Sequence, residues 1–495
     1  MLLTLAFRHL FVRKLRSLFL LLGFALGVGV MIVLLSVGQA MLEQSRDVAL
    51  VGGGEVTVLP QGIDIEAMRT GGLGAMFFGI DRARFLTRQV LGGPRHAGLV
   101  RTVAPAIEGK LLYVCKAARA CRPAAVRAGG EIPSRAAALG AGLAVRQGSW
   151  RDSPADSAYV APTAQQLYDE LDRFHVPPRP DSSWGEWQYY NVVTAENEWW
   201  YVTYLVGGRV GPAAERADRW GGRMLVTHRR PDGRYERFTT TAPAGDVRFD
   251  TTRADLAIGA STVRQRGGVY ILHATAMGPS GTVRMDLRVR PVPNRYFPPV
   301  ELREDEFLSG YVVPGLAATA SGSICLAGRC AEVANAIAYH DHNWGVWRDV
   351  TWEWGAARGS TLSLLYGGVY GPDRPDTGAA VNSPLFLTIV DSLGVRQVLR
   401  FDRVAYEGGR PAVGASGNIA PRRFTLTGSR GADSVTLAVD VEDALATGMA
   451  AASFHRFFLQ MRGRFELRGR LAGQAVRDSG SGFFETYRTT EPRGR

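Results

Sequence analysis

Several common signatures of function are missing from this sequence. Its 495 residues contain four cysteines, no Gly-x-Ser-x-Gly motif and no long basic run, although the net charge is +12. Without that motif, the sequence reveals no nucleophile for a Ser-His-Asp hydrolase. Scattered basic residues are typical of a solvated surface, so we expect no nucleic-acid partner. The length and the apolar content predict two or three domains.

The few cysteines form two local pairs, Cys115 with Cys121 and Cys325 with Cys330. Close pairs in even number favour disulfides in an oxidising compartment. Neither pair has the two-residue gap usual for structural zinc, so zinc binding is the weaker alternative. The residues from Cys325 to Cys330 also predict a hairpin tip, where a disulfide would be tolerated.

Charge is absent from Ser17 to Val37. This run is long enough for the ~20 residues that cross a bilayer as a helix. By the positive-inside rule, the basic residues before it would stay in the cytoplasm. We therefore predict a single-pass anchor in a bacterial inner membrane, with the C-terminal bulk periplasmic or extracellular. A cleaved signal peptide is the alternative, because Gly38-Gln39-Ala40 supplies small residues. The basic residues are Arg8, Arg13, Lys14 and Arg16.

Residues 47–180 predict a small mixed α/β region with one clear helix. Thr163 and Gln166 form a capping box, and Pro177 would end the helix. Leu171 and Phe174 fall on its apolar face with Leu167.

Beyond Trp184 the sequence is typical of β-structure. Short aromatic and β-branched runs are separated by turn signals such as Arg230–Gly233 and Gly278–Gly281. Strands without intervening helices predict an antiparallel sandwich or barrel. Prolines between Pro291 and Pro299 predict a division, so we expect β domains at 181–299 and 300–495 after a cytoplasmic segment and anchor at 1–46.

The stretch from Tyr339 to Gly345 is unusually polar for a core strand. The strand period of two places Tyr339, Asp341 and Asn343 on one face, and His340, His342 and Trp344 on the other. A carboxyl group beside a phenol in an apolar pocket suits general acid catalysis, because desolvation raises its pKa. The alternative is a satisfied polar cluster that closes a barrel.

Other groups leave alternatives open. In a strand, Glu198 shares a face with Trp200, and Trp199 shares the other with Tyr201. Glu198 and Glu485 are either cavity acids or ion-pair partners of arginine, and most tryptophans are expected in the core. His340 and His342, joined by His455, would make a metal site in a less favoured interpretation.

These motifs together resemble the AttH-like and carotenoid 1,2-hydratase (hydroxyneurosporene synthase) family over residues 184–488. The resemblance rests on Glu198–Tyr201, Tyr339–Gly345, Trp352–Trp354 and Gly480–Tyr487. It implies two lipocalin-like antiparallel β-barrel domains and a substrate cavity. It also implies that Asp341, beside Tyr339, protonates an isolated double bond. Where the hydratases place a His and a Trp upstream of the acid, this chain has Tyr311–Pro314, which favours the AttH-like branch.

The first fifty or so residues resemble a MacB/FtsX-type ABC transporter permease. The similarity covers Leu5–Leu10, Arg13–Ser17 and Val56–Pro60. Such permeases continue with further membrane helices, whereas no second apolar run of spanning length follows here. The resemblance therefore implies a topology and an ABC transporter as a candidate partner, not transport by this chain.

The sequence thus leaves two functions open. One is an anchored extracytoplasmic enzyme, hydratase-like or hydrolase-like, that acts on an apolar isoprenoid or lipid-like ligand with Asp341 as general acid and Tyr339 beside it. The other is a non-catalytic lipid-binding component of an ABC permease system. Neither requires a cofactor or a metal ion. The residues expected to contact the ligand are Glu198, Trp199, Trp200, Tyr201, His342, Asn343, Trp344, Trp352, Trp354 and Glu485.

Overall fold

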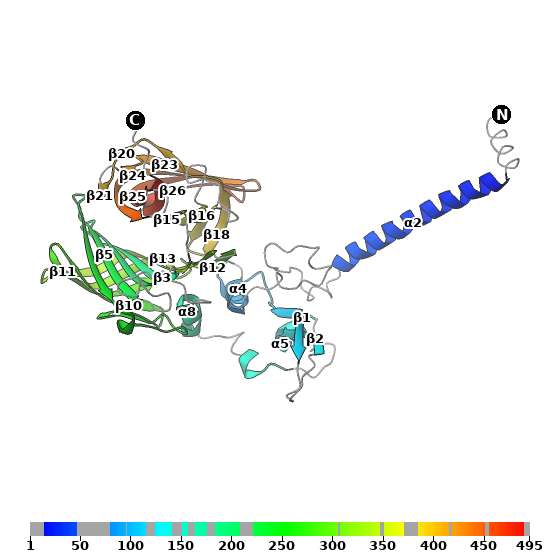
Figure 1. Ribbon diagram of the computed structural model, residues 1–495, viewed down its shortest axis with the longest axis horizontal. Coiled ribbons are helices and arrows are strands. Elements are labelled where there is room, and N and C mark those ends of the chain that lie inside the picture. Colours follow the sequence, from blue (N-terminus) through cyan, green and yellow to red (C-terminus); the bar gives the residue numbers. More distant parts are fainter. Residues whose placement is uncertain are drawn as a thin grey trace. The chain divides into compact units, whose positions relative to one another are not determined.

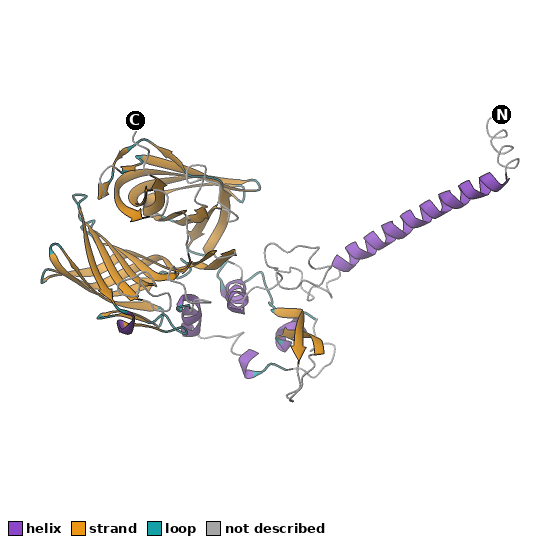
Figure 2. Ribbon diagram, viewed as in Figure 1, coloured by secondary structure: helices purple, strands orange, loops and turns teal. Residues whose placement is uncertain are grey.

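The structure is a computed structural model, and most of its regular elements are β-strands (Figures 1 and 2). Contacts divide the chain into two units, residues 1–91 with 99–161 and residues 92–98 with 162–495. The structure describes residues 14–46, 80–95, 97–114, 124–140, 151–156, 164–175, 184–207, 221–304, 307–346, 351–370, 385–414, 418–450 and 455–489.

Among the described residues of the first unit, the main elements are the helices α2, α4 and α5 and one β-hairpin. The strands β1 (Ala106–Val114) and β2 (Ala124–Glu131) pair antiparallel. The short helix α5 (Pro133–Ala138) begins with a proline at its first turn, where no backbone N–H is needed. The other helices are α2 (Lys14–Arg46) and α4 (Ile80–Gly92).

The helix α2 overlaps the predicted membrane anchor. Large apolar side chains along it are exposed, among them Phe24, Met31 and Leu35. Within the part of the chain that the structure describes, no helix meets the combined length and hydropathy required of a membrane span. Some side chains of Ser17–Val37 lie outside the described residues, so the anchor stays a prediction.

The second unit contains an eight-stranded closed antiparallel barrel. Its ring runs β10–β11–β13–β14–β3–β4–β5–β6 and returns to β10 through one residue pair, Met277 with Thr239. Glycine at Gly278 lets β10 pass over Phe238, because a Cβ there would lie 2.4 Å from that ring. The ring strands are β3 (Trp184–Val193), β4 (Trp199–Gly207), β5 (Gly221–Arg229), β6 (Tyr235–Ala242), β10 (Val269–Gly278), β11 (Gly281–Pro291), β13 (Phe307–Leu326) and β14 (Arg329–Val346).

Shorter elements extend this first sheet. The strands β9, β8 and β7 continue from β10 in that order, and β12 pairs with β13. Their bounds are β7 (Val247–Phe249), β8 (Leu256–Ile258), β9 (Ser261–Arg266) and β12 (Phe297–Glu304), and a 3-10 turn, η3 (Ala244–Asp246), precedes β7.

A second sheet follows in the chain order. It runs β19–β23–β18–β17–β16–β15–β26–β25–β24–β21, and β23 also pairs with β24. The contact between β18 and β23 is one residue pair, Arg400 with Ser429. The bounds are β15 (Thr351–Gly359), β16 (Ser363–Tyr370), β17 (Leu385–Asp391), β18 (Gly394–Phe401), β19 (Ala405–Glu407), β21 (Val413–Gly414), β23 (Arg423–Arg430), β24 (Asp433–Ala450), β25 (His455–Leu471) and β26 (Gln474–Thr489); β20 (Arg410–Pro411) pairs separately with β22 (Ile419–Ala420).

The predicted hairpin tip at the cysteines is confirmed. Cys325 and Cys330 face each other across the end of β13 and β14 and form a disulfide. The connecting Ala327 and Gly328 have φ values of 50° and 81°, the left-handed conformation that two-residue hairpin turns use. Cys115 and Cys121 lie outside the described residues.

Two elements differ from the predicted boundaries. The prolines of Pro291–Pro299 do not divide the sheets, because β13 and β14 complete the first barrel and the second sheet begins at Thr351. Proline is tolerated where a strand edge bends, so it marks an irregular join here. The predicted helix is present as α8 (Ala164–Asp172), and it groups with the β-sheets, not with residues 1–91 and 99–161.

Among the described residues of the second unit, three large apolar clusters and one small one form the core. One fills the first barrel and includes Tyr190, Trp200 and Tyr270. Another belongs to the second sheet. A third, called the inter-sheet layer here, combines side chains of the first sheet, such as Tyr189 and Tyr339, with Trp354 and Phe483 of the second.

Candidate active site

The strand β14 places its polar residues on two opposite faces, as the strand period predicts. Tyr339 belongs to the inter-sheet layer, and Asp341 and Asn343 extend along the same face. His340 stacks on Tyr190 of the barrel core, with ring centroids 4.1 Å apart. The two faces therefore build two separate polar clusters.

Asp341 is a buried acid held by neutral hydrogen-bond donors. It is 2 % exposed. The Tyr339 hydroxyl donates to Asp341 Oδ2 at 2.7 Å, and Asn343 Nδ2 donates to Asp341 Oδ1 at 2.7 Å. Burial raises the pKa of Asp341 well above its usual range, although the hydrogen bond from Tyr339 opposes the rise. A buried carboxyl group whose pKa is raised in this way is suited to act as a general acid.

A second acid, Glu485 of β26, belongs to the same layer. Its Oε1 accepts a hydrogen bond from Gln460 Nε2 at 3.1 Å and a longer one from the Tyr189 hydroxyl at 3.4 Å. Burial raises the pKa of Glu485 to about 7, and these two hydrogen bonds oppose the rise. The charge of Glu485 in turn raises the pKa of Asp341 further, after burial itself. Two carboxyl groups with different proton affinities are the arrangement that acid–base catalysis requires.

Aromatic rings surround these acids. Trp354 Nε1 donates to the Tyr339 hydroxyl at 3.2 Å, and the Tyr339 ring lies 4.8 Å from that of Phe483, edge to face. Tyr311 lies 5.2 Å from Trp354, also edge to face. Aromatic faces stabilise a nearby cation and hold apolar ligands.

Asn191 is an unexpected polar residue in this layer. In the register of β3, it is paired with Tyr339 on one side and Tyr201 on the other, so the three side chains share a face. It is 3 % exposed, and its side-chain Nδ2 and Oδ1 have no hydrogen-bond partner within the described part of the protein. A buried amide in this state costs free energy unless a ligand or water bonds to it.

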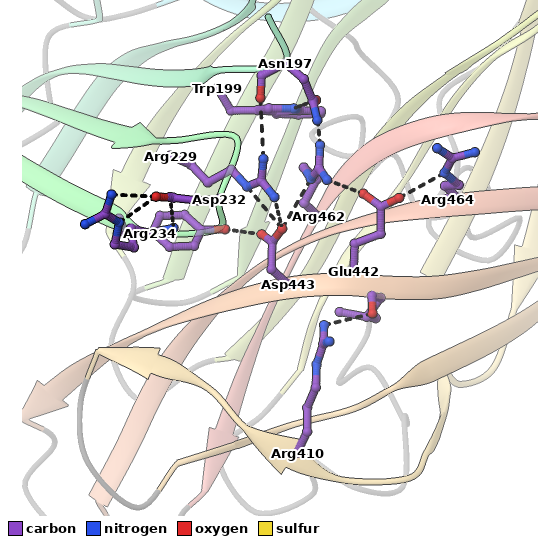
Figure 3. Close-up of polar contacts among 12 residues, drawn as sticks. Asn197, Trp199, Arg229, Asp232, Arg234, Arg410, Glu442, Asp443, Arg462 and Arg464 are labelled. Atoms are coloured by element: carbon purple, nitrogen blue, oxygen red, sulfur yellow. Dashed lines mark hydrogen bonds and ion pairs between the residues drawn. The ribbon is translucent and has the colours of Figure 1, made fainter.

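Arginine and acid side chains bridge the two sheets beside the layer (Figure 3). Arg229 Nη2 of β5 donates to Asp443 Oδ2 of β24 at 2.7 Å, and Arg462 of β25 contacts Asp443 and Glu442. Arg462 also donates to Asn197 Oδ1 at 2.8 Å, and its guanidinium lies 5.4 Å from the centroid of Trp199. This bridge fixes the β4–β5 side of the first sheet against β24 and β25.

An open cleft of about 330 Å³ lies next to this bridge. Tyr235 and Arg237 of β6 line it on one side, and Leu445 and Thr447 of β24 line it on the other. The Tyr235 hydroxyl donates to Asp443, so the cleft and the arginine bridge share a wall.

The other face of β14 carries a charged network inside the barrel. Asp172, the last residue of α8, contacts His340 Nε2 at 3.0 Å and His342 Nδ1 at 2.6 Å. His342 Nε2 lies 2.8 Å from Glu186 Oε1 of β3. Burial alone would raise the pKa of Asp172, but the two histidines lower it well below its usual value. Burial opposes protonation of His342, yet Asp172 and Glu186 raise its pKa to about 10.

The structure does not bring all of the predicted site residues together. Tyr339, Asp341 and Asn343 lie in or along the inter-sheet layer, whereas Trp200 and His342 lie in the first barrel. Glu198 is about one-third exposed and pairs with His228, and Trp344 packs in a small cluster with Trp184. The remaining predicted residues at or beside the layer are Trp199, Tyr201, Trp352, Trp354 and Glu485. The side chain of His455 lies outside the described residues.

Sequence reasoning missed Asn191, Asp172, Glu186 and His175. Each lies in an aromatic strand or beside a predicted helix, where the local sequence pattern gave no reason to assign the residue a functional role. A usable signal was Glu186 itself, a carboxylate within the aromatic strand Trp184–Val193, where a buried charge needs a partner.

Comparisons with known proteins give weak structural similarities only. No family profile matches the chain, and no curated protein matches it. A candidate AttH protein from Nitrosomonas europaea is 14% identical, with a TM-score of 0.44, over 61% of this chain and 92% of that chain. Kievitone hydratase from Nectria haematococca is 16% identical, with a TM-score of 0.41, over 61% and 88%. CghA is 11% identical, with a TM-score of 0.42, over 65% and 95%.

Proposed function

We propose that the inter-sheet layer is the active site of an acid–base enzyme that protonates an apolar, isoprenoid-like or lipid-like substrate. The observation that carries this proposal is the setting of Asp341, a buried carboxyl group whose pKa burial raises and which accepts hydrogen bonds from Tyr339 and Asn343. The resemblance to AttH-like proteins and carotenoid hydratases, noted from the sequence, agrees with this assignment of roles.

In this proposal the two acids divide the reaction. Asp341 donates its proton to a carbon–carbon double bond, which breaks the π bond and leaves a carbocation against the aromatic walls. Glu485, whose pKa is about 7, then takes a proton either from a neighbouring carbon or from a water that attacks the cation. Asn191 supplies the amide that would hold that water or a polar group of the substrate.

The test is a substitution that keeps the shape of the acid. Asp341→Asn in the full-length chain, assayed with a panel of polyene and terpenoid substrates by mass spectrometry, is expected to lower kcat at least 100-fold. This loss matches the contribution of one general acid. Asp440→Asn, the same change at a side chain 71% exposed on β24, is the matched control. Unchanged product formation by Asp341→Asn would remove the acid role.

Asn191 can be tested separately. Asn191→Leu removes a buried amide that has no hydrogen-bond partner among the described residues, so we expect unchanged or higher stability and a loss of product of about tenfold. Thermal unfolding and the same product assay measure the two effects. Lower stability with full activity would make Asn191 a structural residue instead.

A non-catalytic lipid-binding role is the second candidate. The aromatic layer that favours an apolar substrate also favours a retained lipid. Native mass spectrometry of the purified chain distinguishes the two, since a binding protein would carry an unmodified lipid and release it unchanged after incubation. Partnership with an ABC transporter would require co-purification with such a complex.

We also propose that α2 anchors the protein to the inner membrane with the β-sheets outside the cytoplasm. The exposed apolar side chains of α2 support this proposal. Fractionation of cells that express the full chain tests it. Release of the chain by alkaline carbonate, without detergent, would contradict an anchor.

A further inference from the structure

Three metal-ligating side chains converge on the barrel side of β14, away from Asp341. Glu186 Oε1 lies 2.8 Å from His342 Nε2 and 3.0 Å from His175 Nδ1. One nitrogen or oxygen of each residue lies within 4.8 Å of the other two. Neighbouring ligands around a tetrahedral zinc ion with bonds of ~2.1 Å are separated by roughly 3.4 Å, so these atoms need only small shifts to share one ion.

The residues that contact the other side of these candidate ligands are arranged as they are in known metal centres. A ligating histidine usually turns its other ring nitrogen to a carboxylate, which fixes its orientation and tautomer. Here His342 Nδ1 lies 2.6 Å from Asp172 Oδ1, so Nε2 is left to face Glu186. His340 Nε2 holds the second oxygen of Asp172 at 3.0 Å, and its Nδ1 lies 3.1 Å from the Tyr189 carbonyl oxygen.

Two of the three side chains are buried, and the third is partly exposed. The side chains of Glu186 and His342 are 1% and 0% exposed, whereas that of His175 is 22% exposed. The His175 backbone N–H donates to both Glu186 oxygens, at 3.0 and 3.1 Å. Trp344 stacks on the His175 ring at 3.9 Å. An ion could therefore enter beside His175 into a site whose other ligands are already positioned.

We propose that His175, Glu186 and His342 bind one divalent transition-metal ion of the zinc type. Two imidazoles and one carboxylate are a donor set that zinc accepts, with a fourth position left for water on the His175 side. Asp172 is a positioning residue that orients His342. The ion ties the segment after α8 to β3 and β14. This inference does not depend on the proposed function, because Asp341 lies on the opposite face of β14.

Metal analysis of the untagged, full-length, detergent-purified chain tests the proposal. After treatment with a chelator and equilibrium dialysis against Zn²⁺, we expect one equivalent of zinc per chain by plasma mass spectrometry. His175→Gln and Glu186→Gln should each weaken binding at least tenfold. His273→Gln is the matched control, since His273 also contacts a carboxylate, Asp286, but on the exposed surface, and it should bind zinc as the unmodified chain does.

A second measurement separates a metal site from a hydrogen-bonded cluster. Co²⁺ bound by two imidazoles and a carboxylate shows visible absorption bands that report coordination number, and these should be lost in His175→Gln. Asp172→Asn should retain the bands but bind ten- to a hundredfold more weakly, as loss of an orienting carboxylate does. Zinc below a tenth of an equivalent, or binding unaffected by both His175→Gln and Glu186→Gln, would overturn the proposal.

Discussion

Asp172 and Asp341 are both buried in the same β-rich unit, yet their surroundings act in opposite directions. Asp172 is held by two imidazoles, and its pKa falls well below the usual value. Asp341 is held by a phenol and an amide, and burial raises its pKa. Burial alone disfavours charge at both positions, so the charge on the neighbours decides the outcome. One strand, β14, supplies neighbours to both aspartates from its two faces.

The same substitution, aspartate to asparagine, should have the most different effects on stability at these two positions. Asp172→Asn removes the charge that holds His340 and His342, and we expect it to lower the free energy of unfolding by about 3–5 kcal/mol. At Asp341, where burial disfavours the charged carboxylate, Asp341→Asn should cost only about 1 kcal/mol, from one lost hydrogen bond. Urea unfolding at pH 7 measures both. Equal losses would show that both aspartates are charged in the folded protein.

The pH dependence of stability gives a smaller but directional effect. Glu485 has a folded-state pKa of about 7, above its ordinary 4.5, so the folded protein holds a proton that the unfolded chain releases. Stability therefore falls as pH rises from about 4.5 to 7. Glu485 is only partly buried, so we expect about 2 kcal/mol after solvent screening.

Glu485→Gln removes this dependence. The variant should gain stability relative to the unmodified chain as the pH rises from 5 to 8, measured by urea unfolding at both values. Asp440→Asn is the control without such a gain. If the difference between the Gln variant and the unmodified chain does not change with pH, Glu485 is ionised in the folded state throughout.

The smallest expected effect concerns the hydrogen bond to Asp341. Tyr339→Phe removes the hydroxyl that donates to Asp341 and accepts from Trp354 Nε1, at a cost of about 1 kcal/mol. Because this hydrogen bond lowers the pKa of Asp341, the variant should raise that pKa further. A carbon-13 NMR titration of the aspartate carboxyl groups measures the change. A lower pKa would mean that Tyr339 favours the protonated acid.

The sequence predicted the local arrangement of residues along β14 better than the contacts that these residues make with distant parts of the chain. The alternation along β14 placed Tyr339 and Asp341 together and His340 opposite them, because side-chain direction in a strand depends only on sequence spacing. It could not identify Asp172, which is 168 residues from His340 and contacts it only after the barrel closes. Pairings over such distances depend on sheet register, which periodicity does not specify.

Turn chemistry explains which boundaries were predicted correctly. The glycine signals at Arg230–Gly233 and Gly278–Gly281 each connect neighbouring strands, β5 to β6 and β10 to β11. The prolines of Pro291–Pro299 marked an irregular join within one sheet instead of a domain boundary. Glycine at a tight turn specifies the local conformation, whereas proline only excludes a backbone donor and is compatible with several folds.

The number of paired residues between neighbouring strands varies around the barrel. β10 pairs with β11 along nearly its whole length, from Tyr270 with Val289 to Gly278 with Gly281, but it meets β6 only at Met277 with Thr239. On this edge of β10, Val269–His273 pair with β9 instead. Among the described strands, β6 is therefore paired along its length with β5 and at only one residue with β10. We therefore expect the barrel to open first between β6 and β10 during local unfolding in the native state. Amide hydrogens of β6 should then exchange faster than those of β3, which is paired on both sides.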